Sequence, residues 1–269
     1  MTITMEKTIK GAWIVHHSRK ISADTAAPAE YSALDEAGKA AELLMRLGET
    51  NESNLKINEV TAIAKAANLN PRIELPHFIS LLKAKRLIDT SNDEIQVLGV
   101  NTRNVLNHAA DIFEEAQPAS HEVAAIALGE LTSNKPIALS EAKSYIGDNY
   151  KMREADVSDF LRRSSEIGFV DQEGDSPSNI LLFNGNLFKR DAVQKAAHVL
   201  SALSSTEQQK LTEINDQVKS SGCLYAANCE KILGYELFEK LKAAGVLEVN
   251  CQWRSKKVPN SGRRVYQLG

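Results

Sequence analysis

The chain has 269 residues, of which 43% are hydrophobic and 25% are charged, and its formal net charge is -3. This composition is typical of folded globular proteins and excludes disordered, fibrous and collagen-like chains. No apolar run approaches the roughly 20 residues that a membrane-spanning helix needs, and residues 1–20 lack the pattern of a secretory signal. We therefore expect a cytoplasmic protein built from three small domains.

The first 30 residues predict an extension that precedes the first domain. Residues 12–16, which include Trp13 and Val15, indicate a strand, and residues 25–28 indicate a linker. Such a strand either joins a neighbouring sheet of the same chain or adds to the sheet of a partner protein. Trp13 and Val15 are therefore candidate partner contacts.

Residues 31–100 predict a first domain of helices followed by a hairpin. An apolar stripe at helical spacing over residues 35–47 is followed by a short extended stretch at 55–57 and a second helix at 59–67. Pro71 is placed to open a third helix, since proline is tolerated in a helix's first turn. Residues 87–100 then alternate around a polar turn, which predicts a β-hairpin.

The same order of elements recurs in residues 118–188 and again, in a shorter form, in residues 205–269. The segments Leu87-Ile88-Asp89 and Phe169-Val170-Asp171 occupy equivalent places 82 residues apart. The order, together with the residues 57–60, 66–69 and 81–89, resembles the winged helix-turn-helix superfamily. The resemblance implies a mainly α protein with small β-hairpins, an α+β fold of three tandem domains. It also implies that the helix after each tight turn, and the hairpin or wing, are the surfaces that contact DNA.

Two amphipathic segments join the three copies, at residues 101–117 and 189–204. Each presents an apolar stripe that must be buried, either between neighbouring domains or across a dimer. The first stripe supplies further candidate partner or dimer contacts, which are Val105, Leu106, Ile112 and Phe113.

The charge is distributed unevenly, which singles out the C-terminal copy as the candidate for nucleic acid. Residues 101–188 carry 14 acidic against 7 basic residues, whereas residues 189–269 carry 13 basic against 8 acidic residues. Phosphate contacts supply most non-specific affinity for DNA, so the acidic middle is unsuitable. In the third copy the candidate DNA-binding residues are Lys240, Lys242, Trp253, Arg254, Lys256, Lys257, Arg263 and Arg264. An open alternative is that this basic run only keeps an edge hairpin from aggregating, and that Trp253 covers the foot of the hairpin.

The first copy is ambiguous by the same test of charge. Its third helix and the following turn carry weaker nucleic-acid candidates, but its wing carries Asp89, Asp93 and Glu94. These weaker candidates are Arg72, Lys83, Lys85 and Arg86. In the second copy the arginines are outnumbered by acidic residues, so we expect no DNA contact there.

Motifs of catalysis are not found in the sequence. It has no phosphate-binding glycine motif and no H-E-x-x-H, and its three cysteines form no C-x-x-C pair. His16 and His17 are adjacent, and on a strand they would point to opposite faces, so a shared metal is not expected. We expect no enzyme activity, no cofactor and no metal.

The sequence is compatible with two functions. The first is a DNA-binding protein, a regulator or a subunit of a DNA-associated assembly, that contacts duplex DNA through its third copy. The second is an adaptor that binds other proteins through tandem winged helices without touching DNA, because a fold alone does not decide function. A small-molecule effector is also compatible with the sequence, since pockets between helices leave little trace in it.

Overall fold

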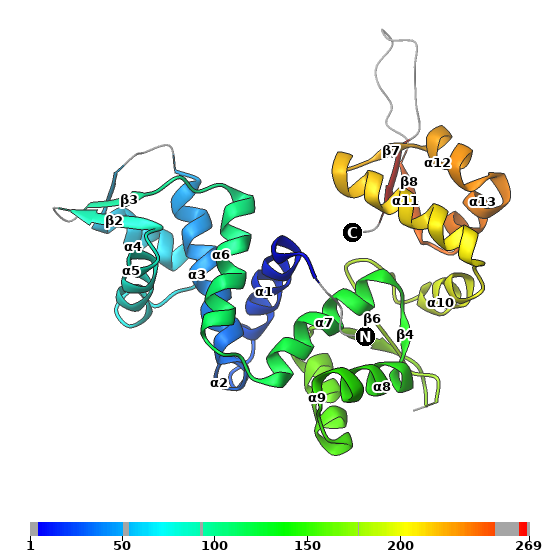
Figure 1. The fold of residues 1–269 in the computed structure, drawn as a ribbon, viewed down its shortest axis with the longest axis horizontal. Helices are drawn as coiled ribbons and strands as arrows, with labels where there is room; N and C mark the ends of the chain where they lie inside the picture. The colour runs from blue at the N-terminus through cyan, green and yellow to red at the C-terminus, as the bar shows by residue number, and fades with distance from the viewer. Residues whose placement is uncertain (1–4, 51–53, 92–93, 177, 251–263, 268–269) are drawn as a thin grey trace, which may run out of the picture. The chain divides into compact units, whose positions relative to one another are not determined.

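A computed structural model describes residues 5–50, 54–91, 94–176, 178–250 and 264–267 (Figure 1). The protein is mainly helical, with small antiparallel three-stranded sheets, as predicted. The helices are α1 Lys7–Ile21, α2 Ala27–Glu30, α3 Ser32–Gly48, α4 Ile57–Ala66, α5 Glu74–Ala84, α6 Thr102–Glu115, α7 Ser120–Asn134, α8 Leu139–Tyr150, α9 Glu154–Ile167, α10 Val193–Ser201, α11 Ser205–Ser221, α12 Ala226–Leu233 and α13 Tyr235–Ala243. The strands are β1 Leu55–Lys56, β2 Ile88–Ser91, β3 Glu94–Val97, β4 Ile137–Ala138, β5 Asp171–Glu173, β6 Leu181–Phe183, β7 Leu224–Tyr225, β8 Leu247–Asn250 and β9 Arg264–Gln267.

The chain divides into two compact units. The first unit contains residues 1–127 and 146–169, and the second contains residues 128–145 and 170–269. The segment predicted as the second domain, 118–188, therefore contributes to both units.

One order of elements recurs three times along the chain, as the sequence predicts. A helix is followed by a two-residue strand, two further helices and a hairpin, and the short strand pairs with the second strand of that hairpin. The sheet orders are accordingly β1-β3-β2, β4-β6-β5 and β7-β9-β8, and every pairing is antiparallel.

The helix before each hairpin ends in the same way. The amide of Leu87 donates to the carbonyl of Leu82 over 3.0 Å. In the other two copies the amide of Phe169 donates to the carbonyl of Ser164 over 2.8 Å, and the amide of Val246 donates to the carbonyl of Leu241 over 3.0 Å. Each bond encloses one residue in the left-handed region, which is Arg86 (φ 58°), Gly168 (φ 86°) or Gly245 (φ 73°). This helix-terminating turn confirms the 82-residue offset between the first two copies.

The strand predicted at residues 12–16 is wrong, because these residues lie inside α1 (Figure 1). Their bulky and β-branched side chains favour a strand locally. The buried positions Gly11, Ile14, Val15, Ser18 and Ile21 nevertheless follow helical spacing. Glycine and serine within this stripe hide its period, so five apolar-rich residues are too short a window to distinguish the two structures. The segment read as a linker likewise includes the start of α2.

Helix α1 packs against α3 and α6 in the first unit. Lys10 of α1 forms a 2.8 Å ion pair with Glu114 of α6, and Thr8 donates to the Asn107 side chain over 3.1 Å. The predicted stripe of residues 101–117 is thereby buried inside the unit, with Phe113 fully covered.

The second predicted connecting helix, α10, is buried in the core of the second unit. Its residues Val193, Ala196, Val199 and Leu200 join one apolar cluster with the faces of α12 and α13. Ser204 and Glu207 cap the following helix, α11, reciprocally.

Candidate functional site

The C-terminal copy presents the predicted DNA-contacting helix as α13. Gly234 (φ 86°) separates α12 from α13, and the buried face of α13 consists of Leu237, Phe238 and Leu241. Its opposite side is open to solvent, where Tyr235 is 68% exposed. Packing against α12 therefore fixes which side of α13 faces outward.

The two lysines predicted on α13 differ in their surroundings. Lys242 forms hydrogen bonds of 2.6 and 2.7 Å with the carboxylate of Glu239, and its Nζ lies 5.7 Å from the centre of the Phe238 ring. Lys240 is exposed and makes no ion pair within the described part of the chain. Of the two, Lys240 is the better placed to reach a phosphate.

The hairpin of this copy is defined by the pairing of β8 with β9. The register runs from Leu247↔Gln267 to Asn250↔Arg264, and β9 also pairs with β7 through Tyr225↔Arg264. The backbone of Arg264 thus belongs to β9. The other predicted residues of the wing, Trp253, Arg254, Lys256, Lys257 and Arg263, lie outside the described residues.

In the first copy, two of the four weaker candidates are engaged by neighbouring side chains. Lys85 forms an ion pair with Glu115 of α6, and Lys83 donates to the hydroxyl of Thr90. Arg72 and Arg86 are exposed. The copy therefore presents fewer available cations than its sequence suggests.

The two arginines of α9 in the second copy, and Arg153 just before this helix, are all paired with carboxylates. Arg153 bonds Asp156 at 2.7 and 3.0 Å, and Arg162 bonds Asp159 and Glu166. Arg163 bonds Glu30 and Glu166 at 3.1 Å. The hydrogen bonds from Arg163 and Arg162 lower the pKa of Glu166, which keeps this carboxylate charged. The surface of α9 is therefore neutralised or acidic, and unsuitable for a polyanion.

The predicted partner contacts are mostly covered by the chain itself, which corrects their assignment. Val105, Ile112 and Phe113 are buried where α6 meets α1 and α3, and Val15 is 6% exposed. Leu106 is half-buried and its backbone lies against Gly11. Trp13 is also half-buried, with its ring 5.4 Å from that of His17. The physical reason is that α1, read as a strand, is the helix that covers the stripe.

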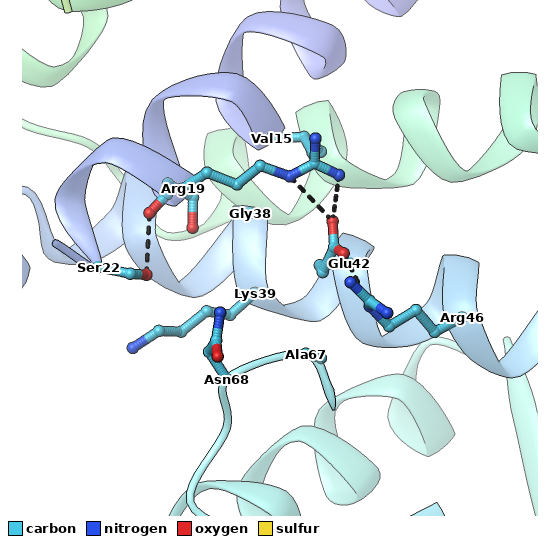
Figure 2. Close-up of a pocket in the computed structure, with 10 residues that line it drawn as sticks. Val15, Arg19, Ser22, Gly38, Lys39, Glu42, Arg46, Ala67 and Asn68 are labelled. Carbon is cyan, nitrogen blue, oxygen red and sulfur yellow. Dashed lines mark hydrogen bonds and ion pairs between the residues drawn. The ribbon is translucent and has the colours of Figure 1, made fainter. Parts of the chain in front are cut away.

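A pocket that the sequence did not predict lies between α1, α3 and the turn from α4 to α5 in the first unit (Figure 2). Its volume is about 430 Å³. Arg19 from α1 donates to one oxygen of Glu42 over 2.6 and 3.2 Å, and Arg46 donates to the other over 2.8 Å. Glu42 and Arg46 at helical spacing were visible in the sequence, but Arg19 was not placed beside them because α1 was not recognised.

No group of three or more histidine, cysteine or acidic side chains within the described ranges is arranged to hold a metal ion. None of the helices in that part of the chain is long and apolar enough to cross a membrane. No known protein family, curated protein or solved structure with which we compared the chain matches it.

Proposed function

We propose that the protein is a tandem winged-helix protein that binds duplex DNA through its C-terminal copy. The observation that carries this proposal is the β8–β9 register, which ends at Asn250↔Arg264 and leaves the basic run of residues 251–263 as the connection between two paired strands. In a winged helix this connection is the wing, which reaches the DNA backbone or minor groove while the preceding helix enters the major groove.

The distribution of charge supports the same copy. The connection and Arg264 together carry Arg254, Lys256, Lys257, Arg263 and Arg264 with no acidic residue among them. Each cation that contacts a phosphate releases counterions from the duplex, so binding by such a wing depends steeply on salt. The paired arginines of α9 and the ion-paired Lys85 leave the other two copies as weaker candidates.

The proposal is tested by the binding of a fluorescently labelled random duplex, measured by anisotropy from about 50 to 200 mM salt. We expect the intact chain to bind, with an affinity that falls steeply as salt rises. A variant in which the five basic residues of the wing are changed to alanine should lose most of this affinity and flatten the salt dependence. The five substitutions are Arg254→Ala, Lys256→Ala, Lys257→Ala, Arg263→Ala and Arg264→Ala.

A matched control separates the wing from a general effect of net charge. It replaces five basic residues elsewhere, so the change in formal charge is the same, and it should bind nearly as well as the intact chain. The control substitutions are Lys65→Ala, Arg103→Ala, Lys143→Ala, Lys189→Ala and Lys195→Ala. Equal losses in the two variants, or no binding at low salt, would overturn the assignment of DNA contact to this wing.

A second candidate function, a protein-interaction adaptor, is favoured by a different observation. Ile73, immediately before α5, is 74% exposed, and Tyr235, at the start of α13, is 68% exposed. The two side chains occupy corresponding positions of two copies and would serve as contacts with another protein, since the cores of protein interfaces are apolar and enriched in aromatic residues. Absence of DNA binding in the salt series would favour the adaptor function. The partner contacts would then be expected at Ile73 and Tyr235, and not on the stripe of α6, which is buried.

A further inference from the structure

The pocket between α1, α3 and the α4–α5 turn contains two guanidinium groups around one carboxylate. Figure 2 shows Arg19 and Arg46 on either side of Glu42, and both arginines bond it. The Glu42 side chain is 13% exposed, whereas those of Arg19 and Arg46 are 62% and 40% exposed. This cluster therefore carries one positive charge in excess at the edge of the pocket.

The acid of this cluster remains ionised at neutral pH. Burial alone would raise the pKa of Glu42, but the hydrogen bonds and charges of Arg19 and Arg46 outweigh burial and lower it. Lys39, which also lines the pocket, is occupied separately, because its ammonium pairs with Asp35 at 2.8 Å and with Glu74 at 2.9 Å. The positive charge in excess therefore lies on the side of the two arginines, whereas Lys39 with its two carboxylates carries a negative charge in excess on the other side.

Some hydrogen-bond donors at the edge of the pocket have no partner among the described residues. The guanidinium of Arg46 uses its Nε for Glu42, and its two terminal nitrogens donate no hydrogen bond to any described residue. Asn68, on the turn below, lines the pocket, and its carboxamide makes no hydrogen bond within the described chain. A planar fork of N–H donors with excess positive charge is the arrangement that recognises phosphate and carboxylate oxygens.

We propose that this pocket binds a small oxyanion-bearing molecule, an organic phosphate or carboxylate, whose anionic group lies against Arg46 and Arg19. A volume of about 430 Å³ is in the range of small-molecule sites. Val15, Gly38 and Ala67 supply an apolar wall for the remainder of the ligand. Because Ala67 and Asn68 belong to the turn that leads into α5, the bound molecule contacts both the α1–α3 pair and this turn.

The test uses the full chain and two probes, pyrophosphate and malonate, titrated by isothermal calorimetry at constant ionic strength set with sodium chloride. Saturable binding with a stoichiometry near one is expected for at least one probe, and the probe that binds more tightly identifies the ligand as phosphate or carboxylate. Arg46→Gln should weaken that binding about tenfold or more, because it removes a charged donor pair. Arg46→Lys, which keeps the charge but loses the fork, should give an intermediate loss.

Two further variants keep the proposal falsifiable. Arg103→Gln makes the same chemical change on α6, where the side chain is 76% exposed, and should leave binding unchanged. Ser22→Phe fills part of the pocket without altering its charge and should also weaken binding. No saturable binding by either probe, or equal losses in Arg46→Gln and Arg103→Gln, would overturn the proposal. These outcomes are distinguishable from those of the DNA-binding experiment, since Arg46→Gln leaves the basic wing unchanged and the wing substitutions leave Arg19 and Arg46 in place.

Discussion

At the scale of single residues, the imidazole of His17 is fully buried in the first unit, and only one of its two nitrogens has a partner among the described residues. Its Nε2 lies 3.1 Å from the carbonyl oxygen of Ala125, and its ring centre lies 4.4 Å from that of Phe169. The Nδ1 atom is buried without a partner among the described residues. Burial, with a smaller contribution from His16, lowers the pKa of His17 to about 3. His17 is therefore neutral in the folded protein at physiological pH.

This burial predicts a loss of stability in acid. The unfolded chain takes up a proton at His17 near pH 6.5, whereas the folded chain does so only near pH 3. The contribution to stability is thus fully present above pH 6.5 and is lost as the pH falls from 6.5 toward 3. The expected slope is up to about 1.4 kcal/mol of unfolding free energy per pH unit, measured by urea denaturation at a series of pH values.

The assignment to His17 is checked by comparing slopes between variants. His17→Gln, which retains a donor for the Ala125 carbonyl, should give a clearly shallower dependence on pH between 4 and 6.5. His77→Gln alters an exposed histidine of α5 and leaves His17 in place, so it should retain the steep dependence. An unchanged slope in His17→Gln would assign the acid sensitivity to other groups.

At the scale of elements, the close crossing of α1 and α6 depends on Gly11. A Cβ atom at this position would clash with the backbone of Leu106, lying within 2.9 Å of its Cα and closer still to its carbonyl. Because the obstacle is backbone rather than a flexible side chain, a larger residue requires the two helices to separate.

Gly11→Ala is accordingly expected to destabilise the first unit, although alanine favours a helix more than glycine does. Overpacking at this crossing should cost about 1–3 kcal/mol, which exceeds the gain of about 1 kcal/mol in helix propensity. Gly147→Ala is the matched control, since its Cβ would meet only Val157 Cγ2 at 3.9 Å. Thermal unfolding should show a lower midpoint for the first variant and an equal or higher midpoint for the second. A higher unfolding midpoint for Gly11→Ala would contradict the close approach of α1 to α6 at this position.

The elements that the sequence predicted correctly are those in which apolar residues keep a regular spacing over a long segment, or which end in a distinctive turn. The stripe predicted over residues 35–47 lies within α3, and the helix predicted at 59–67 overlaps α4. Each hairpin follows a helix that ends at a residue with positive φ. This residue is Arg86 in the first copy but Gly168 and Gly245 in the other two, so the residue type does not reveal that the three positions correspond, and only their spacing does. Helix α1 was missed because its stripe includes glycine and serine, and the pocket around Arg19 and Glu42 was missed with it.

At the scale of the whole molecule, the sequence predicted a threefold recurrence but not the division into two compact units. Periodicity reports which face of a helix is buried and does not report which neighbour buries it. The stripe of α6 is covered by α1, and that of α10 joins the core of the last copy. Both were read as surfaces between domains or subunits because the covering helix could not be identified from spacing.

Two units with separate cores should lose their structure separately. Leu241 of α13 and Leu44 of α3 are both 0% exposed, and each belongs to a different unit. Replacing either leucine with alanine leaves a cavity that should cost about 2–5 kcal/mol. Measured by hydrogen exchange of the full chain, Leu241→Ala should accelerate exchange in α10–α13 and leave the amides of α1, α3 and α6 protected, because local opening follows the unit that is destabilised.

Leu44→Ala is the reciprocal control for this experiment. It should accelerate exchange in α1, α3 and α6 and leave α10–α13 as protected as in the unaltered chain. If either substitution accelerated exchange to the same extent in both sets of helices, the chain would unfold as one cooperative body. Opposite patterns in the two variants would instead show that the two units open separately, so that a ligand bound beside α3 would stabilise the first unit by mass action without stabilising the C-terminal copy.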